Sequence, residues 1–158
     1  MTTALYPGSF DPVTLGHLDI VLRAASMYDS VVVAVAHSRS ALFSTDERVA
    51  FFSEAVADLP NVRVIAHHGL TVDCARAEGA TVLVKGLRST TDFSYEFDMA
   101  LMNRKMAPDV DSAFLMTSVE YLVLSSSRVR ELASFGLDVS DLVPPGVAAA
   151  LQEKFGEE

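Results

Sequence analysis

The 158-residue sequence contains one cysteine, Cys74, and no apolar run that approaches the ~20 residues of a membrane-spanning helix. A single cysteine cannot form an intrachain disulfide, which favours a cytoplasmic setting. The first residues, Met1 to Ala4, lack the basic region and long apolar stretch that mark a signal peptide. These absences predict a protein with no membrane segment.

Positive charge is also scarce, because 12 Lys and Arg residues stand against 21 Asp and Glu residues and the net charge is −9. Proteins that coat DNA or RNA depend on a surplus of Lys and Arg, so we expect no nucleic-acid partner. An anionic small substrate is still compatible, since its site needs only a local cluster of positive groups. With 50% hydrophobic and 21% charged residues, the composition is that of a globular protein.

Short β-branched runs alternate with helical patterns along the chain. The run Ser30–Ala36 is apolar without alternation, which is typical of a strand covered on both faces. Similar runs predict strands at Ala4–Tyr6, Ser30–Ala36, Val62–Ala66, Thr81–Lys85 and Ala113–Met116. Apolar spacing and capping residues predict helices at His17–Met27, Ser44 to about Asp58, Gly69 or Thr71 to Gly79, Asp92 to about Met106, Ser126–Phe135, and after Pro145.

The alternation of strand and helix predicts a single α/β domain over residues 1–158. Its fold class is a doubly wound sheet of about five parallel strands, with helices on both faces. In such sheets ligands bind outside the carboxyl ends of strands, where the strand order reverses. The loops that follow strands are therefore where we expect the chemistry.

The first of these loops runs from Gly8 to His17 and enters a helix. Gly8 and Gly16 allow a ligand to approach the backbone closely, and free N–H groups at a helix start suit phosphate. His17 falls in the first helical turn, where its ring can donate to a phosphate oxygen. An ordinary capped turn with a hydrogen-bonded histidine fits the same residues, and the spacing is neither a Walker A nor a GxGxxG loop.

Two more loops offer groups that bind phosphate. In Lys85-Gly86-Leu87-Arg88, lysine supplies a point charge and arginine a planar fork. The segment Ser125-Ser126-Ser127 opens a helix that also carries Arg130, and its hydroxyls can cap the helix or donate to phosphate. Each loop taken alone also fits a structural explanation, as a solvated basic loop or as a simple N-cap.

The predicted helix Asp92–Met106 is apolar on most sides, which indicates a buried helix at a subunit contact. Glu96, Met99 and Asn103 share one face of it by their spacing. In an apolar setting Glu96 and Asn103 need polar partners. Either a structural pair, or a ligand with ribose hydroxyls or an amide, would satisfy them.

Together these segments resemble the nucleotidyltransferase superfamily marked by a (His/Thr)-x-Gly-His motif, here Thr14-Leu15-Gly16-His17. The second mark of that superfamily is a Ser-Ser-(Ser/Thr)-x-x-(Arg/Lys) motif, here Ser125 to Arg130. Within it the chain is similar to the bacterial phosphopantetheine adenylyltransferases over nearly its whole length. The blocks that carry this resemblance are Tyr6 to Pro12, Lys85 to Arg88, Asp92 to Glu96, Met102 to Arg104 and Leu124 to Ser127.

The resemblance implies transfer of the adenylyl group of ATP to 4′-phosphopantetheine, which gives dephospho-coenzyme A and pyrophosphate in the penultimate step of coenzyme A synthesis. It further implies a Rossmann-like fold, Mg²⁺ with ATP, a homo-oligomer that is usually a hexamer, and coenzyme A as a feedback ligand. The ATP-binding residues that it implies are Ser9, Phe10, His17, Gly86, Leu87, Arg88, Glu96, Tyr121, Leu122, Val123, Leu124, Ser125, Ser126 and Ser127.

The same resemblance implies a set of residues that contact phosphopantetheine. Two positions depart from the family: Ser9 stands where Thr is usual, and Arg39 is the best match for a loop lysine, with its charge kept but its geometry changed. The implied phosphopantetheine residues are Ser9, Arg39, Leu70, Thr71, Lys85, Met99, Asn103 and Glu131, and the implied catalytic residues are His17, Arg39, Lys85, Arg88 and Ser126.

The acceptor in this reaction is itself a phosphate, with a second pKa of about 6, so it needs no general base. We therefore expect direct in-line attack on the α-phosphate without a covalent intermediate, and catalysis by positioning and charge neutralisation. No protein ligand of Mg²⁺ is assigned, since phosphates usually supply most of its ligands. The alternatives are a glycerol-phosphate cytidylyltransferase, a nicotinamide-mononucleotide adenylyltransferase, or a noncatalytic nucleotide-sensing module on the same scaffold.

Overall fold

The computed structural model describes residues 1–156. Among these residues, five strands form one sheet in the order β3-β2-β1-β4-β5, and every neighbouring pair is parallel. The strands are β1 Thr3–Gly8, β2 Ser30–Ala36, β3 Val62–His67, β4 Val82–Leu87 and β5 Asp111–Met116. This confirms the predicted parallel sheet.

Helices follow the strands in the predicted alternation. They are α1 Leu15–Met27, α2 Thr45–Ala55, α3 Thr71–Ala77, α4 Thr90–Met106, α5 Ser126–Ser134 and α6 Pro145–Phe155, with a short 3₁₀ turn η1 at Val119–Tyr121. Side chains at the helix starts explain where several of them begin. Thr14 and His17 form a capping box at α1, and Ser44 and Glu47 form another at α2.

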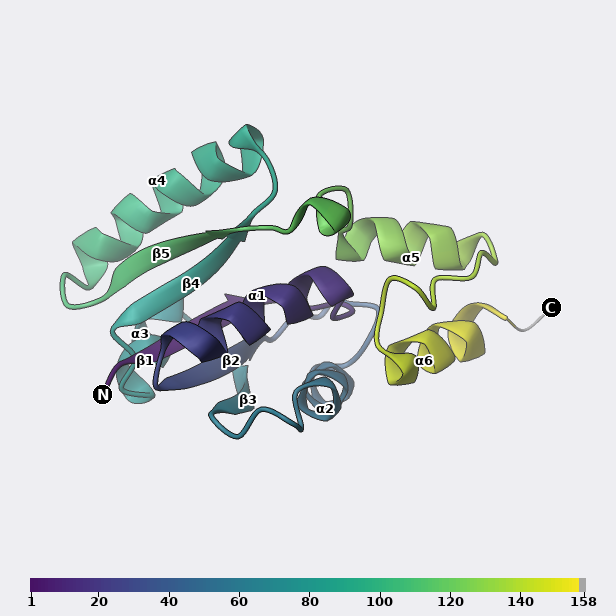
Figure 1. The fold of residues 1–158 in the computed structure, drawn as a ribbon, viewed down its shortest axis with the longest axis horizontal. Helices are drawn as coiled ribbons and strands as arrows, with labels where there is room; N and C mark the ends of the chain where they lie inside the picture. The colour runs from purple at the N-terminus through teal and green to yellow at the C-terminus, as the bar shows by residue number, and fades with distance from the viewer. Residues whose placement is uncertain (157–158) are drawn as a thin grey trace.

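The two faces of the sheet carry separate hydrophobic cores, because alternate side chains of a strand point to opposite faces. In β2, Val31, Val33 and Val35 join a core with α1, α2, α5 and α6. Val32 and Ala34 of β2 instead join the core that includes α3 and the end of α4. Figure 1 shows α1 and α3 on opposite faces, as in a doubly wound sheet.

The strand order reverses between β1 and β4. After β3 the chain returns through α3 to pair β4 with the free side of β1. The connections that leave β1 and β4 therefore go to opposite faces of the sheet, which opens a crevice at their carboxyl ends. Helices α5 and α6 pack together beyond this end of the sheet (Figure 1).

Several element bounds differ from the sequence expectations, and two of these differences concern residues of the predicted site. Strand β4 extends to Leu87, so Lys85, Gly86 and Leu87 pair with β5 and only Arg88 follows the strand. Helix α4 starts at Thr90 rather than Asp92, because the Ser89 side chain accepts the N–H of Asp92 and forms the N-cap.

In the single chain α4 is not buried, so its predicted burial at a subunit contact stays a prediction. Its apolar side chains are largely exposed, while Asn103 is the buried residue of the helix. The exposed ones are Phe93, Tyr95, Phe97, Met99, Leu101, Met102 and Met106. An apolar surface of this kind marks an interaction face.

In the part of the chain that the structure describes, no helix is both long enough and apolar enough to cross a membrane.

Candidate active site

A cavity of about 400 Å³ lies at the carboxyl ends of β1 and β4, where the strand order reverses. Its walls come from the β1–α1 connection, the end of β4, the start of α4 and the segment that enters α5. The lining residues are Tyr6, Pro7, Gly8, Ser9, Phe10, Thr14, Gly16, His17, Ile20, Lys85, Gly86, Arg88, Asp92, Glu96, Thr117, Tyr121, Leu124, Ser125, Ser126 and Ser127.

The turn after β1 is shaped by Phe10, whose backbone is left-handed with φ 48° and whose side chain is buried. Its ring packs edge-on against Tyr6, His17 and Phe52, with centroid distances of 5.1, 5.0 and 4.8 Å. A Cβ at Gly8 would lie 2.8 Å from the tip of the same ring, which explains the glycine. The aromatic cluster therefore fixes the turn that carries Ser9.

His17 has a defined tautomer. Its Nδ1 accepts the backbone N–H of Thr14 at 3.0 Å, so the ring proton must sit on Nε2. Burial, together with the smaller effect of the nearby positive charge of Arg88, lowers the pKa of His17 to about 4. At neutral pH the ring is therefore an uncharged Nε2–H donor beside the cavity. The capping interpretation of His17 is confirmed, and its contact with phosphate stays a prediction.

Lys85 and Glu96 face each other across the cavity. Lys85 Nζ lies 3.4 Å from Glu96 Oε2, and both side chains are mostly buried, with exposed fractions of 23% and 21%. No hydrogen bond reaches Glu96 Oε2 from any residue in 1–156. The pair is thus held by charge alone, and both groups keep hydrogen-bonding capacity for a ligand.

Arg88 is oriented by two neighbours. Its Nε lies 3.4 Å from the Asp92 carboxylate, which also accepts the Arg88 N–H at 3.1 Å. Its Nη1 donates to the Leu124 carbonyl at 3.2 Å. The guanidinium is therefore held between α4 and the segment that enters α5, while 38% of the side chain stays exposed.

The serine segment has a structural role as well as a place in the cavity wall. Ser125 caps α5 by accepting the N–H of Arg128. The Ser126 hydroxyl donates its proton to the Pro12 carbonyl at 2.7 Å. In this arrangement the hydroxyl can accept a further hydrogen bond but cannot donate one. Arg130 contacts the Ser127 hydroxyl at 3.4 Å and donates to the Asp11 carbonyl at 2.5 Å.

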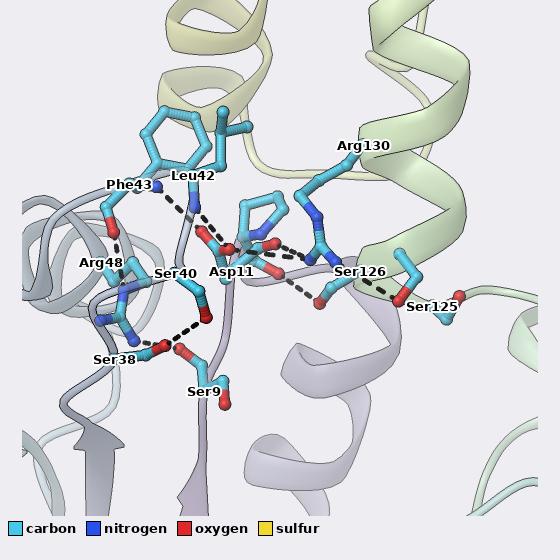
Figure 2. A network of polar contacts seen from close by, with 12 residues as sticks. Ser9, Asp11, Ser38, Ser40, Leu42, Phe43, Arg48, Ser125, Ser126 and Arg130 are labelled. Carbon is cyan, nitrogen blue, oxygen red and sulfur yellow. Dashed lines mark hydrogen bonds and ion pairs between the residues drawn. The ribbon is translucent and has the colours of Figure 1, made fainter.

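A polar network ties the β1–α1 connection to the loop after β2 (Figure 2). The buried Asp11 carboxylate accepts the N–H groups of Leu42 and Phe43 at 2.8 and 3.0 Å and lies 3.7 Å from Arg130. On the other side of the loop, the guanidinium of Arg48 from α2 donates to the Ser9 carbonyl at 2.7 Å. Three segments distant in sequence thus meet at one rim of the cavity.

The structure brings more than half of the predicted site residues together. Those that line the cavity are Ser9, Phe10, His17, Lys85, Gly86, Arg88, Glu96, Tyr121, Leu124, Ser125, Ser126 and Ser127. Gly86 also has a packing role, because a Cβ there would lie 3.1 Å from Ile20 of α1. Their individual roles stay predictions.

The other predicted residues lie outside the cavity wall. Leu70 and Thr71 start α3, and Met99 and Asn103 lie on α4; both helices cover the same face of the sheet. Arg39 is exposed on the loop after β2, and Glu131 is exposed on α5. Leu87 ends β4, and Leu122 and Val123 are exposed next to η1.

Sequence reasoning did not single out Thr117, Asp11 or Arg48 as site residues. Thr117 follows β5, and the rule that loops after strands carry chemistry could have found it. Asp11 sits inside the first loop, but its partners in the loop after β2 are remote in sequence. Nothing in the pattern of α2 separates Arg48 from a solvent-exposed arginine.

Within residues 1–156, no group of three or more His, Cys, Asp or Glu side chains is arranged to hold a metal ion. The cavity carboxylates of Asp92 and Glu96 each face a cation, Arg88 and Lys85. A divalent ion at this site would need most of its ligands from a bound substrate.

Comparisons with known proteins show which family the chain resembles. Residues 5–132 match the cytidylyltransferase-like family. A phosphopantetheine adenylyltransferase from Desulforudis audaxviator is 51% identical, covering 99% of this chain and 97% of that protein. One from Methylococcus capsulatus is 52% identical, covering 97% of this chain and 96% of that protein.

A solved structure shows the same fold. The putative nicotinate-nucleotide adenylyltransferase from Vibrio parahaemolyticus superimposes with a TM-score of 0.71 and covers 98% of this chain and 93% of its own. Its sequence identity is 18%, so this likeness concerns the fold alone.

Proposed function

The chain belongs to the phosphopantetheine adenylyltransferase family, and we propose that it transfers the adenylyl group of ATP to 4′-phosphopantetheine. The products are dephospho-coenzyme A and pyrophosphate, in the penultimate step of coenzyme A biosynthesis. The observation that carries the proposal is the single cavity that joins His17, Lys85, Arg88 and the Ser125–Ser127 segment. Relatives of this name cover nearly the whole chain at about half identity, which supports it.

The chemistry needs no protein base. A phosphate oxygen of 4′-phosphopantetheine forms a bond to the α-phosphorus of ATP, and the bond from that phosphorus to the α–β bridging oxygen breaks. The electron pair leaves with pyrophosphate, and the acceptor is already mostly a dianion, since its second pKa is about 6. The protein contributes by holding the two phosphates in line and by stabilising the charge that builds on them.

Each cavity group has a part in this proposal. The neutral Nε2–H of His17 donates to a non-bridging oxygen of the α-phosphate, because its Nδ1 is already occupied. Arg88, held by Asp92 and Leu124, binds the ATP phosphates. Lys85 turns from Glu96 toward the acceptor phosphate, and Glu96 is then free to accept hydrogen bonds from ATP.

Mg²⁺ enters this proposal as part of the Mg·ATP substrate. It would neutralise charge on the phosphates that leave as pyrophosphate. The carboxylates beside the cavity are engaged with cations, which fits an ion held mainly by ATP.

We also propose a homo-oligomer, specifically a hexamer, in the cytoplasm, with coenzyme A as a feedback ligand. The exposed apolar side chains of α4 support self-association, because apolar side chains that gather on one exposed helix often mark a protein contact. Analytical ultracentrifugation tests the assembly, and product formation at rising coenzyme A concentration tests the feedback.

The decisive assay measures pyrophosphate release from Mg·ATP with and without 4′-phosphopantetheine, with mass-spectrometric detection of dephospho-coenzyme A. Release that requires the acceptor supports the proposal. Activity with CTP and glycerol phosphate, or with nicotinamide mononucleotide, would assign the chain to another reaction of the superfamily. ATP binding without any turnover would indicate a nucleotide sensor.

A further inference from the structure

Arg48 is a charged side chain that is completely buried, with 0% of its surface exposed. It comes from α2 and points to the rim of the cavity. Its guanidinium donates to the carbonyl oxygens of Ser9, Ala36 and Phe43 at 2.7, 2.8 and 3.0 Å, and to the Thr45 hydroxyl at 3.1 Å. One side chain thus holds the turn after β1, the end of β2 and the start of α2 together.

All four of these acceptors are uncharged. Among residues 1–156, no carboxylate forms an ion pair with Arg48, although Asp11 binds the same loop from its other side. Burying a charge without a counter-charge is costly, and an apolar side chain would fill the same space more cheaply. An apolar side chain cannot supply the several directed hydrogen bonds that the planar guanidinium donates.

The first segment that Arg48 holds is the Ser9 turn. The carbonyl of Ser9 is bound by Arg48, and the next residue, Phe10, has the left-handed backbone that non-glycine residues rarely adopt. The hydrogen bond fixes the peptide between the two residues. The Ser9 side chain, which lines the cavity, takes its direction from that peptide.

The second segment is the loop after β2 that carries Arg39. Arg48 binds this loop at the Ala36 and Phe43 carbonyls. Asp11 binds it at the N–H groups of Leu42 and Phe43 (Figure 2). Residues 37–41, with Arg39 at their centre, lie between these fixed ends. The direction in which the Arg39 side chain extends from the protein therefore depends on the hydrogen bonds made by both Arg48 and Asp11.

Resting on the proposed adenylyl transfer, we propose that Arg48 is a positioning residue for that reaction. It fixes the Arg39 loop relative to the Ser9 turn, so that a charge from the loop and a hydroxyl from the turn act on the same phosphates. Arg48 itself does not line the cavity and acts through Ser9 and Arg39.

The test uses full-length Arg48→Met and Arg48→Lys, with Arg76→Met as the matched control because Arg76 is exposed and pairs with Asp109 away from the cavity. Activity is expressed per folded molecule, from circular dichroism and thermal unfolding. We expect Arg48→Met to lower kcat by about 10²-fold, since displaced groups have effects of that order, with a smaller change in KM for ATP. Arg48→Lys keeps the charge without the fork and should recover only part of the loss.

A double-mutant cycle with Arg39→Ala supplies the measurement that a purely structural role would not move. If Arg48 acts through the loop, Arg48→Met costs far less kcat in the Arg39→Ala background than in the wild type. Additive effects, an unchanged kcat per folded molecule, no effect of Arg39→Ala alone, or failure of both Arg48 variants to fold would each overturn the inference. An inactive wild type would instead contradict the proposed function.

Discussion

Replacing His17 by asparagine separates its helix-capping role from its proposed donor role. The Asn oxygen can accept the Thr14 N–H in place of Nδ1, because the two atoms are at the same distance along the side chain. Asparagine then has no group that reaches the position of Nε2. His17→Asn should therefore keep the start of α1 and lose the donor to the α-phosphate, whereas His17→Ala loses both.

The structure sets the expected size of the effect. A neutral, fixed N–H donor aimed at developing charge contributes about 10²–10³-fold in kcat, or about 2.7–4 kcal/mol. We expect that loss in His17→Asn, with a much smaller change in KM for ATP, since the variant leaves unchanged Arg88 and the serine segment, which we propose to bind the phosphates. His68→Asn is the control, because His68 is exposed outside the cavity. A nearly unchanged kcat in His17→Asn would refute the donor role.

The pKa of His17 gives a second readout. The unfolded chain protonates this ring near 6.5, while the folded chain does so only at about 4. Because the unfolded state binds the proton first, stability falls as the pH drops from 6.5 toward 4, by at most about 3 kcal/mol for this group. Urea unfolding should show this drop in the wild type and not in His17→Asn. NMR titration of His17 near its ordinary pKa, or a proton on Nδ1, would contradict the tautomer assignment.

The remaining predictions concern other parts of the site and the surface. In steady-state kinetics, Lys85→Met should raise KM for 4′-phosphopantetheine by at least tenfold, or about 1.4 kcal/mol, and should raise KM for ATP by less. Equal increases in both KM values would contradict a specific role of Lys85 in binding the acceptor. Asp11→Ala should lower the free energy of unfolding by about 3 kcal/mol, because it leaves Arg130 and two loop N–H groups without their buried carboxylate; a loss below about 1 kcal/mol in urea titrations would show that the loop is held elsewhere. Leu101→Glu should dissociate the proposed oligomer in analytical ultracentrifugation, since it places a charge on the exposed apolar face of α4; an unchanged sedimentation coefficient would place the interface elsewhere.

Local patterns predicted the elements well. The apolar run of β2 predicted that strand with its observed bounds, and the Ser44 and Glu47 capping box predicted the start of α2. The apolar spacing of α1 predicted the helix but placed its start at His17 rather than Leu15. The start of α4 was misplaced because Ser89 and Asp92 can both cap a helix, and only the backbone geometry shows that Ser89 does so. The predicted burial of α4 at a subunit contact stays a prediction, because the single chain leaves its apolar face exposed.

The sequence by itself determined the fold class and the loops that line the cavity, because strand and helix alternation dictates where the carboxyl ends of parallel strands meet. Tertiary structure decided the protonation, the burial and the hydrogen-bond partners of the site residues. The proton on Nε2 of His17, the approach of Lys85 to Glu96 and the buried fork of Arg48 depend on three-dimensional placement that spacing does not encode. Contacts between remote segments set burial and hydrogen bonding, and these decide what the residues in the loops can do.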